Sequence, residues 1–195
     1  ERVGGAVSAR LIASGARSVA IDMAGVTGRV PPAAAAAHVA LGAVLRGYRF
    51  DRYRTRLPEK KRATLAEVAL VNADPAAGEA FGPLAAAARG VVFARDLVTE
   101  PANIIFPESF VERARAELAP LGVGVEVLDE AAMRALGMGA LLGVAQGSAR
   151  PPYLLVLRWD GTGGSRSTPQ AALVGKGVTF DTGGISIKPA QGMED

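Results

Sequence analysis

The stretch PESFVERARAELAPLGVGVEVLDEAAMRALG, residues 107–137, shows the alternation of elements from which the fold class can be inferred. A proline opens its first part, and Phe110, Ala114 and Leu118 then recur at the spacing of one helix face. The run VGVEVLD that follows predicts a strand, and Asp129 predicts the cap of a further helix. Helices that alternate with strands in this way indicate an α/β architecture.

The alternation continues in both directions along the chain. Towards the N-terminus the pattern predicts a helix over 3–15, a strand over 18–23, a helix over 33–46 and a strand over 64–71. An alanine-rich helix follows Asp74, interrupted at Gly82-Pro83, and its length predicts a connector between two domains. Towards the C-terminus, residues 151–159 predict an apolar strand. Such continuous apolar strands favour mainly parallel pairing, with helices on both faces of the sheet.

The composition is that of a globular protein, with 195 residues of which 49% are hydrophobic and 21% are charged. No apolar run reaches the roughly 18 residues that cross a bilayer, and the start lacks the apolar stretch of a secretion signal. We therefore expect a cytoplasmic protein with no membrane partner. Glu1 stands where an initiator methionine belongs, and Asp195 follows no helix stop. Both ends predict a segment of a longer protein.

Cysteine and histidine usage limits the chemistry. The chain has no cysteine, which excludes disulfides and thiolate–metal sites. Its one histidine, His38, would have to serve any Ser-His-Asp or Cys-His site or any HExxH zinc helix. His38 lies in a helix pattern without an acidic or serine neighbour along the sequence, which favours an ordinary helix histidine. A metal site here must therefore use carboxylates, amines and carbonyls.

A basic segment, YRFDRYRTRLPEKKR at residues 48–62, interleaves aromatic side chains with arginine and lysine. With a net charge of +3 and a pI near 9.6, it raises the hypothesis of nucleic-acid binding, since the cations could hold phosphates and the rings could stack on bases. The alternative is a solvated connection between a helix and a strand, in which Asp51 and Glu59 dilute the field. The sequence leaves both interpretations open.

A second unusual stretch, LVGKGVTFDTGGISIKP at residues 173–189, combines glycines, lysines and one aspartate. It does not match the phosphate-binding patterns. Gln170 stands at the first glycine position of a Walker loop, and Phe180 stands where the third glycine of a dinucleotide fingerprint belongs.

A metal site fits this stretch better, because a lysine whose pKa is lowered by adjacent cations can ligate through its neutral amine. Lys176 and Asp181 are five residues apart and would lie on opposite faces of a regular strand. The flanking glycines permit the bend or bulge that would bring them together. Lys188, beyond the next turn, could return to the same cleft and stay charged. In the alternative interpretation, these are surface lysines and a turn aspartate.

Three blocks of the sequence resemble the leucyl aminopeptidase, or cytosol aminopeptidase, family. VGKGVTFDTGGISIKPAQGMED at 174–195 resembles the family signature, ARDLVTEPANIIFPESF at 94–110 resembles the entry to its catalytic domain, and YRFDRYRT at 48–55 is similar to part of its N-terminal domain. The resemblance implies an N-terminal α/β domain joined by a helix to a zinc-peptidase-like α/β catalytic domain. The expected divisions are 1–74, 75–99 for the connecting helix and 100–195, with both domains incomplete.

The resemblance also implies an activity: a metal-dependent aminopeptidase that releases N-terminal residues, preferably leucine, from peptides with a free N-terminus. It implies two divalent ions (zinc, manganese or magnesium), a bound bicarbonate and a homohexamer. Lys176 and Asp181 fall on metal-binding positions, and Lys188 falls on the catalytic lysine. The remaining metal carboxylates and the bicarbonate-binding arginine are expected beyond Asp195. An inactive scaffold of the same fold, or a nucleic-acid-binding protein that uses residues 48–62, remains as the alternative.

Overall fold

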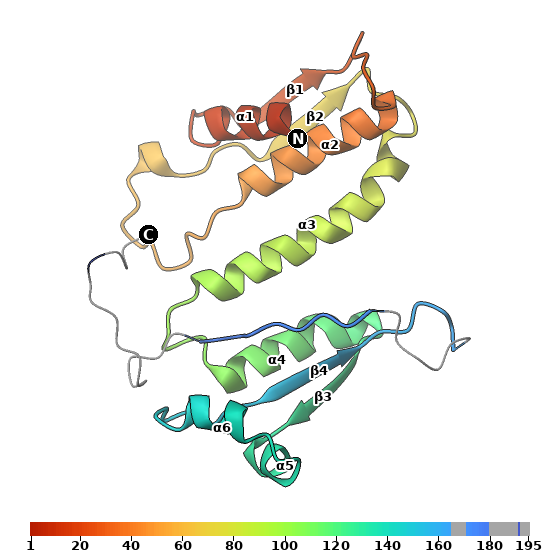
Figure 1. Cartoon of the computed structure of the whole chain (residues 1–195). Helices are drawn as coiled ribbons and strands as arrows, with labels where there is room; N and C mark the ends of the chain where they lie inside the picture. The colour runs from red at the N-terminus through yellow and green to blue at the C-terminus, as the bar shows by residue number, and fades with distance from the viewer. Residues whose placement is uncertain (165–170, 180–190, 192–195) are drawn as a thin grey trace. The chain divides into compact units, whose positions relative to one another are not determined.

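The fold is that of a computed structural model, in which residues 1–164, 171–179 and 191 are described (Figure 1). The chain divides into two compact units, residues 1–99 and 100–195. Unit 1 contains helices and a parallel pair of strands, and unit 2 contains helices and an antiparallel pair. The α/β class predicted from the sequence is therefore confirmed.

Unit 1 begins with helix α1 (Arg2–Leu11), strand β1 (Ser18–Asp22) and helix α2 (Pro32–Gly47), followed by the short 3-10 helix η1 (Glu59–Lys61), strand β2 (Glu67–Val71) and helix α3 (Ala77–Thr99). Strands β1 and β2 pair in parallel, with Ser18 opposite Glu67 and Asp22 opposite Val71. Helix α2 lies between α1 and α3 (Figure 1) and supplies most of the buried residues of this unit.

The contact between α1 and α2 is close enough to bring the two backbones together. A Cβ placed on Gly4 would overlap the carbonyl oxygen of Val39 and would lie 2.9 Å from the amide nitrogen of Ala43. The hydroxyl of Ser8, one turn further along α1, is buried and donates to the carbonyl oxygen of Ala43 at 3.1 Å. Glycine at position 4 therefore sets the separation of the two helices.

Helix α3 continues without interruption through Gly82 and Pro83, so the predicted break is wrong. Pro83 cannot donate to the carbonyl of Glu79, but both residues are exposed, and water can solvate the carbonyl. Ahead of the helix, the carboxylate of Asp74 accepts a hydrogen bond from the amide of Ala76 at 2.9 Å. Asp74 thus organises the turn that leads into α3, which begins at Ala77.

Unit 2 contains helix α4 (Pro107–Leu118), the 3-10 turn η2 (Ala119–Leu121), strand β3 (Gly124–Leu128), helices α5 (Glu130–Ala135) and α6 (Gly139–Ala145), and strand β4 (Leu154–Arg158). The carboxylate of Asp129 accepts from the amide of Ala132 at 2.8 Å, which confirms the predicted cap. Met133, on α5, has no solvent exposure, and Ala114, on α4, has 3%.

Strands β3 and β4 pair antiparallel, with Gly124 opposite Arg158 and Leu128 opposite Leu154. The expectation of mainly parallel pairing is therefore wrong for this pair, because an apolar run carries no information on the direction of a strand. Helix α6 was not predicted, because Gly139 and Gly143 lower the helical propensity of this short segment. Among the described residues, no helix combines the length and the apolar character needed to cross a membrane.

Candidate functional site

The lysine of the metal-site hypothesis lies in an extended, exposed segment. Lys176 belongs to the described residues 171–179, which form no helix or strand. Leu173 and Val174 just before it are each 99% exposed, and Val178 is 69% exposed. Residues 171–179 thus form no strand in the described part of the chain, although their apolar run is typical of one. In an earlier turn, the carboxylate of Asp160 accepts hydrogen bonds from the Thr162 hydroxyl and from the amides of Thr162 and Gly164. The bond from the Thr162 hydroxyl is the largest cause of the lowered pKa of Asp160, and the two amides contribute to it.

The other two predicted site residues, Asp181 and Lys188, lie outside the described residues. The convergence of Lys176, Asp181 and Lys188 therefore stays a prediction. Within the part of the chain that the structure describes, no group of three or more acidic, histidine or cysteine side chains could hold a metal ion.

The single histidine is occupied by a structural contact. His38 lies on α2, is 44% exposed at its side chain, and places Nδ1 at 2.9 Å from Oε1 of Glu1. This partner could not be recognised from the sequence, because 37 positions separate the two residues. This surface pair at the contact of α1 with α2 agrees with the interpretation of His38 as an ordinary helix histidine.

The entry to unit 2 holds a buried ion pair that sequence reasoning missed. The side chain of Glu100 has no solvent exposure, and its Oε1 accepts from Nη1 of Arg113 at 2.8 Å. Nearby, the hydroxyl of Ser109 donates to the carbonyl of Ile104 at 2.8 Å and accepts from the amide of Phe106 at 2.9 Å. These bonds fix the turn before α4. The one available signal was an acidic residue immediately before a proline, inside the block at 94–110.

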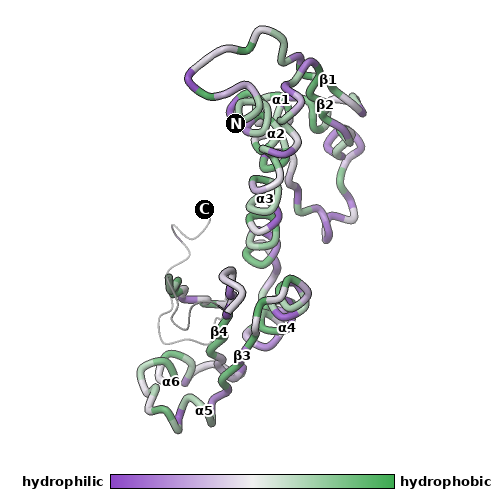
Figure 2. The backbone as a smooth tube through the Cα atoms, turned by 90° about the vertical axis from the view of Figure 1, so that its right-hand side faces the viewer, coloured by the Kyte–Doolittle hydropathy of each residue, from purple (hydrophilic) through white to green (hydrophobic). Residues whose placement is uncertain are grey.

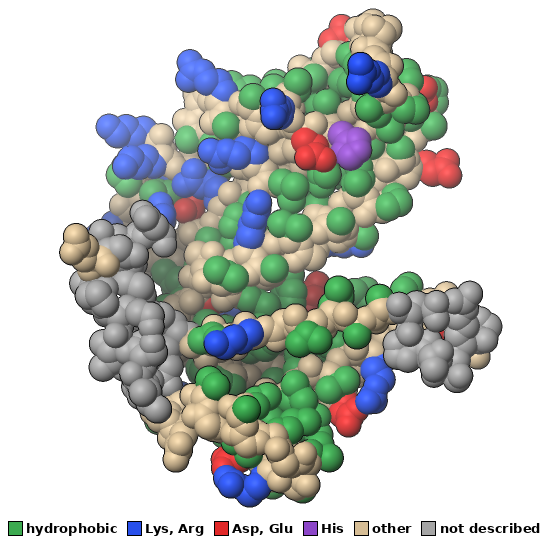
Figure 3. Space-filling model, in the orientation of Figure 1, with side chains coloured by type: hydrophobic (Ala, Val, Ile, Leu, Met, Phe, Trp, Pro, Cys, Tyr) green, Lys and Arg blue, Asp and Glu red, His purple; other side chains and the backbone are tan. Residues whose placement is uncertain are grey.

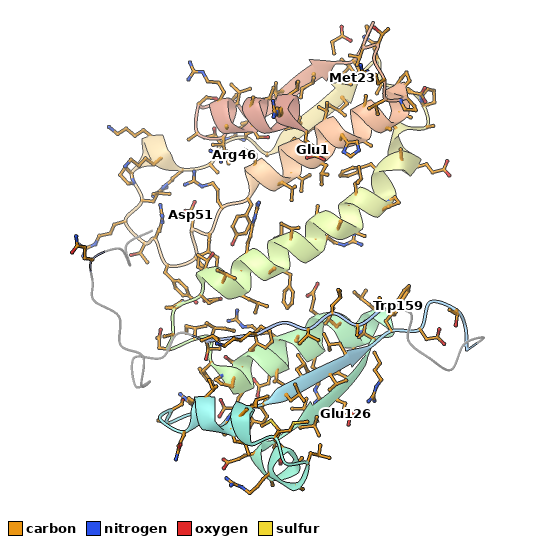
Figure 4. All side chains as sticks on the ribbon, in the orientation of Figure 1. Glu1, Met23, Arg46, Asp51, Glu126 and Trp159 are labelled. Atoms are coloured by element: carbon orange, nitrogen blue, oxygen red, sulfur yellow. The ribbon has the colours of Figure 1, made fainter. Side chains whose placement is uncertain are left out.

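The basic segment, residues 48–62, is folded back on itself. Arg49 donates from Nε to the carboxylate of Asp51 at 2.7 Å and from Nη2 to the carbonyl of Lys61 at 3.0 Å. The guanidinium of Arg49, ahead of a weaker contact of Arg54 at 3.7 Å, lowers the pKa of Asp51. Figure 4 labels Asp51 in this loop and Arg46 at the end of the preceding helix. Figure 2 shows the loop as largely hydrophilic beside the apolar helices.

One aromatic residue of the basic segment, Tyr48, makes contacts that stabilise unit 1. The hydroxyl of Tyr48 donates to Oδ1 of Asp96 at 2.9 Å, and the guanidinium of Arg95 lies 5.5 Å from the Tyr48 ring centroid. Arg95 also donates to the carbonyl of Leu45 at 2.6 Å. Partial burial and the bond to Asp96 raise the pKa of Tyr48. Tyr48 therefore ties α2 to α3 through its hydroxyl.

Family profiles match residues in both units of the chain. The profile of the cytosol aminopeptidase family, catalytic domain, matches residues 92–195, and the profile of its N-terminal domain matches residues 1–57. The chain belongs to the cytosol aminopeptidase family. All three predicted site residues lie within the match to the family's catalytic domain, and the basic segment begins within the match to its N-terminal domain.

Individual family members are similar over the whole chain. A Rhizobium johnstonii protein named "Probable cytosol aminopeptidase" is 52% identical over 197 aligned positions, which cover 100% of this chain and 38% of that protein. The chain thus spans less than half the length of this curated relative.

Two solved structures share the fold. The bottromycin maturation enzyme BotP in complex with Mn is 36% identical, with a TM-score of 0.73 over 96% of this chain and 39% of BotP. A mutant of tomato leucine aminopeptidase is 28% identical, with a TM-score of 0.68 over 79% of this chain and 31% of that enzyme. This cytosol aminopeptidase chain therefore shares its fold with a part of each of these two proteins.

Proposed function

We propose that the protein is a metal-dependent aminopeptidase that releases N-terminal residues, preferably leucine, from peptides. The observation that carries the proposal is the match of the aminopeptidase catalytic domain to residues 92–195, a range that includes Lys176, Asp181 and Lys188. The similarity to a manganese-bound relative supports divalent-metal chemistry. Because the chain covers 38% of the curated relative, the activity belongs to the complete protein.

The donor set of the proposed site fits a divalent metal. Lys176 offers an amine and Asp181 a carboxylate, a combination that zinc, manganese and magnesium sites can use when further carboxylates complete the shell. When bound, the metal ions supply a Lewis acid and lower the pKa of a coordinated water. Lys176 would offer its amine nitrogen to a metal ion, and Asp181 would contribute negative charge that offsets the cations.

Lys188 has a different role in the proposal, because its amine stays protonated. Its ammonium donates to the oxygen of the scissile carbonyl as negative charge develops there during attack by water. The donor must be held in place before the reaction, and the Gly183-Gly184 turn between Asp181 and Lys188 gives the backbone the freedom to return the lysine to the site. Bicarbonate is proposed as the group that accepts the proton of the attacking water.

Hydrolysis of a leucine anilide by the purified natural protein tests the activity. We expect turnover with added manganese, loss of turnover after chelation and recovery when manganese is restored. Absence of turnover with manganese, zinc and magnesium in turn would contradict the enzyme proposal and favour an inactive scaffold. Elution as a homohexamer in size-exclusion chromatography, and presence in the cytoplasmic fraction of cells, would test the proposed assembly and location.

Substitutions separate the proposed roles. Lys188→Ala should lower kcat by about 10²–10³-fold with metal content intact, which is the cost of one lost oxyanion donor. Asp181→Ala and Lys176→Ala should lose bound metal, measured by elemental analysis. Lys60→Ala, an exposed lysine of unit 1, is the matched control and should change neither quantity. A Lys188→Ala variant with unchanged kcat would remove Lys188 from the mechanism.

A further inference from the structure

The sequence contains one Asp-Gly pair, Asp160-Gly161, in the turn that follows β4. Both residues are exposed. An aspartate before a glycine is prone to a rearrangement of the backbone, because glycine has no side chain to hinder attack by its own amide nitrogen on the neighbouring carboxyl group. The pair is therefore a candidate site of spontaneous chemical modification.

The turn starts from a fixed strand end. Arg158, the last residue of β4, donates from Nη1 to the carboxylate of Glu126 on β3 at 2.6 Å. Figure 4 labels Glu126 and the neighbouring Trp159, and Figure 3, in the same orientation, shows a basic and an acidic side chain together at this end of unit 2. The geometry of the turn is thus set by the residues that follow this ion pair.

The rearrangement proceeds through a cyclic imide. The amide nitrogen of Gly161 bonds to Cγ of Asp160, a C–O bond of the carboxyl group breaks, and the amide proton leaves with that oxygen as water. Water then adds to the imide. Cleavage of the imide bond to the original carbonyl carbon leaves Gly161 joined to Cγ, which is isoaspartate. The two steps together neither add nor remove atoms, and solvent water is their one co-reactant.

Three hydrogen bonds oppose the first step. Oδ1 of Asp160 accepts from the Thr162 hydroxyl at 2.6 Å and from the Thr162 amide at 2.8 Å, and Oδ2 accepts from the Gly164 amide at 2.7 Å. These donors lower the pKa of Asp160, the Thr162 hydroxyl most of all. The carboxyl group must be protonated to lose an oxygen as water, and both of its oxygens are held in the ionised form.

Packing requires glycine at position 161. A Cβ on Gly161 would lie 2.5 Å from the ring of Trp159, so a larger residue would displace that ring. A bulkier residue after Asp160 would also slow the rearrangement, and the contact with Trp159 prevents this solution. Protection of the pair therefore depends on the donors to the carboxylate.

We propose that the turn at residues 160–164 protects the Asp160-Gly161 bond, and that Asp160 becomes a site of isoaspartate formation when the Thr162 hydroxyl is lost. This property is separate from peptide hydrolysis. Isoaspartate at position 160 would insert one atom into the backbone just after β4 and would remove the carboxylate that organises the turn.

Incubation of the purified natural protein at neutral pH, below its melting temperature, tests the proposal. Trypsin cleaves after arginine and releases WDGTGGSR, residues 159–166, as one peptide. The aspartate and isoaspartate forms of this peptide have the same mass but separate in reversed-phase chromatography, and the absorbance of Trp159 quantifies both. Labelling by a methyltransferase specific for isoaspartyl carboxylates confirms the assignment.

Three variants isolate the hydroxyl. Thr162→Val removes the hydroxyl and keeps the amide donor, and Thr162→Ser restores a hydroxyl. Thr27→Val, at an exposed threonine of unit 1, is the matched control. Circular dichroism shows that each variant is folded, and incubation in denaturing urea gives the rate for each unfolded chain.

Thr162→Val should form isoaspartate about three- to tenfold faster than the natural protein, which is the effect of losing one hydrogen bond of ordinary net strength. Thr162→Ser and Thr27→Val should keep the natural rate. In urea, all four proteins should react faster and at similar rates. Equal rates in the folded natural protein and folded Thr162→Val would overturn the proposal, and so would a natural protein that reacts as fast when folded as in urea.

Discussion

Adding one methyl group at Gly4 should destabilise unit 1, whereas the same change at Gly5 should not. Both glycines lie in α1, so alanine improves helical propensity by up to about 1 kcal/mol at either position. A Cβ at Gly4 overlaps the backbone of Val39. At Gly5 the nearest atom is the carbonyl oxygen of Gly42 at 3.6 Å, which is ordinary van der Waals contact. The two variants thus gain the same helical propensity but differ in how the added methyl group packs.

The expected magnitudes follow from this difference. Overpacking costs about 1–3 kcal/mol, and the upper end applies at Gly4 because the atoms that must move belong to the backbone of α2 rather than to a flexible side chain. Subtracting the propensity gain leaves Gly4→Ala about 2 kcal/mol less stable. Gly5→Ala should be about 0.5–1 kcal/mol more stable.

Hydrogen–deuterium exchange of the purified protein at increasing urea concentration measures these values locally, in the peptides that cover residues 1–15 and 32–47. Protection should fall in both peptides for Gly4→Ala and should rise slightly for Gly5→Ala. Equal protection in the two variants would refute the close approach of α1 to α2, because it would leave helical propensity as the one term that acts.

Three further changes test individual contacts. Arg113→Ala leaves the buried carboxylate of Glu100 without this cation, and urea denaturation should show a loss of stability of about 2–4 kcal/mol. A change below about 0.5 kcal/mol would show that the ion pair does not stabilise the fold. The pKa of Tyr48 is raised in the fold, so the contribution of Tyr48 to stability is present below pH 10 and is lost as pH rises. Tyr48→Phe should therefore flatten the alkaline decline in melting temperature. An unchanged decline would contradict the role of the Tyr48 hydroxyl. The pKa of Asp51 is lowered, so its contribution to stability is present above about pH 4 and is lost as pH falls. Asp51→Asn should remove that part of the loss of stability in acid. A melting temperature that falls with pH as it does in the natural protein would contradict this prediction.

Local signals in the sequence predicted the elements of the fold well. The proline before Glu108, the cap at Asp129 and the apolar runs at β1 and β4 each act within a few residues, so each can be recognised without knowledge of the rest of the chain. Strand direction and long-range pairs cannot be recognised from a few neighbouring residues. The antiparallel register of β3 with β4 and the pairing of Glu100 with Arg113 depend on where distant segments meet.

The candidate site was predicted from a different kind of information. Spacing alone left Lys176 and Asp181 on opposite faces of a strand, and the resemblance to a family supplied their roles. The family match confirms the resemblance over residues 92–195, whereas the geometry of the site stays a prediction. For the basic segment, the composition showed the positive charge in advance, but it did not show that Tyr48 is bonded to Asp96.

Pro83 sets an order of events in the folding of α3. A helix grows by adding one backbone hydrogen bond at a time to a nucleus, and Pro83 has no amide hydrogen to contribute. Residues 84–99 form the longer uninterrupted run of α3, so nucleation is favoured there. The turns at 77–82 would then join last, guided by the bond between Asp74 and Ala76. We accordingly expect α3 to unfold first at its N-terminal end as the temperature rises.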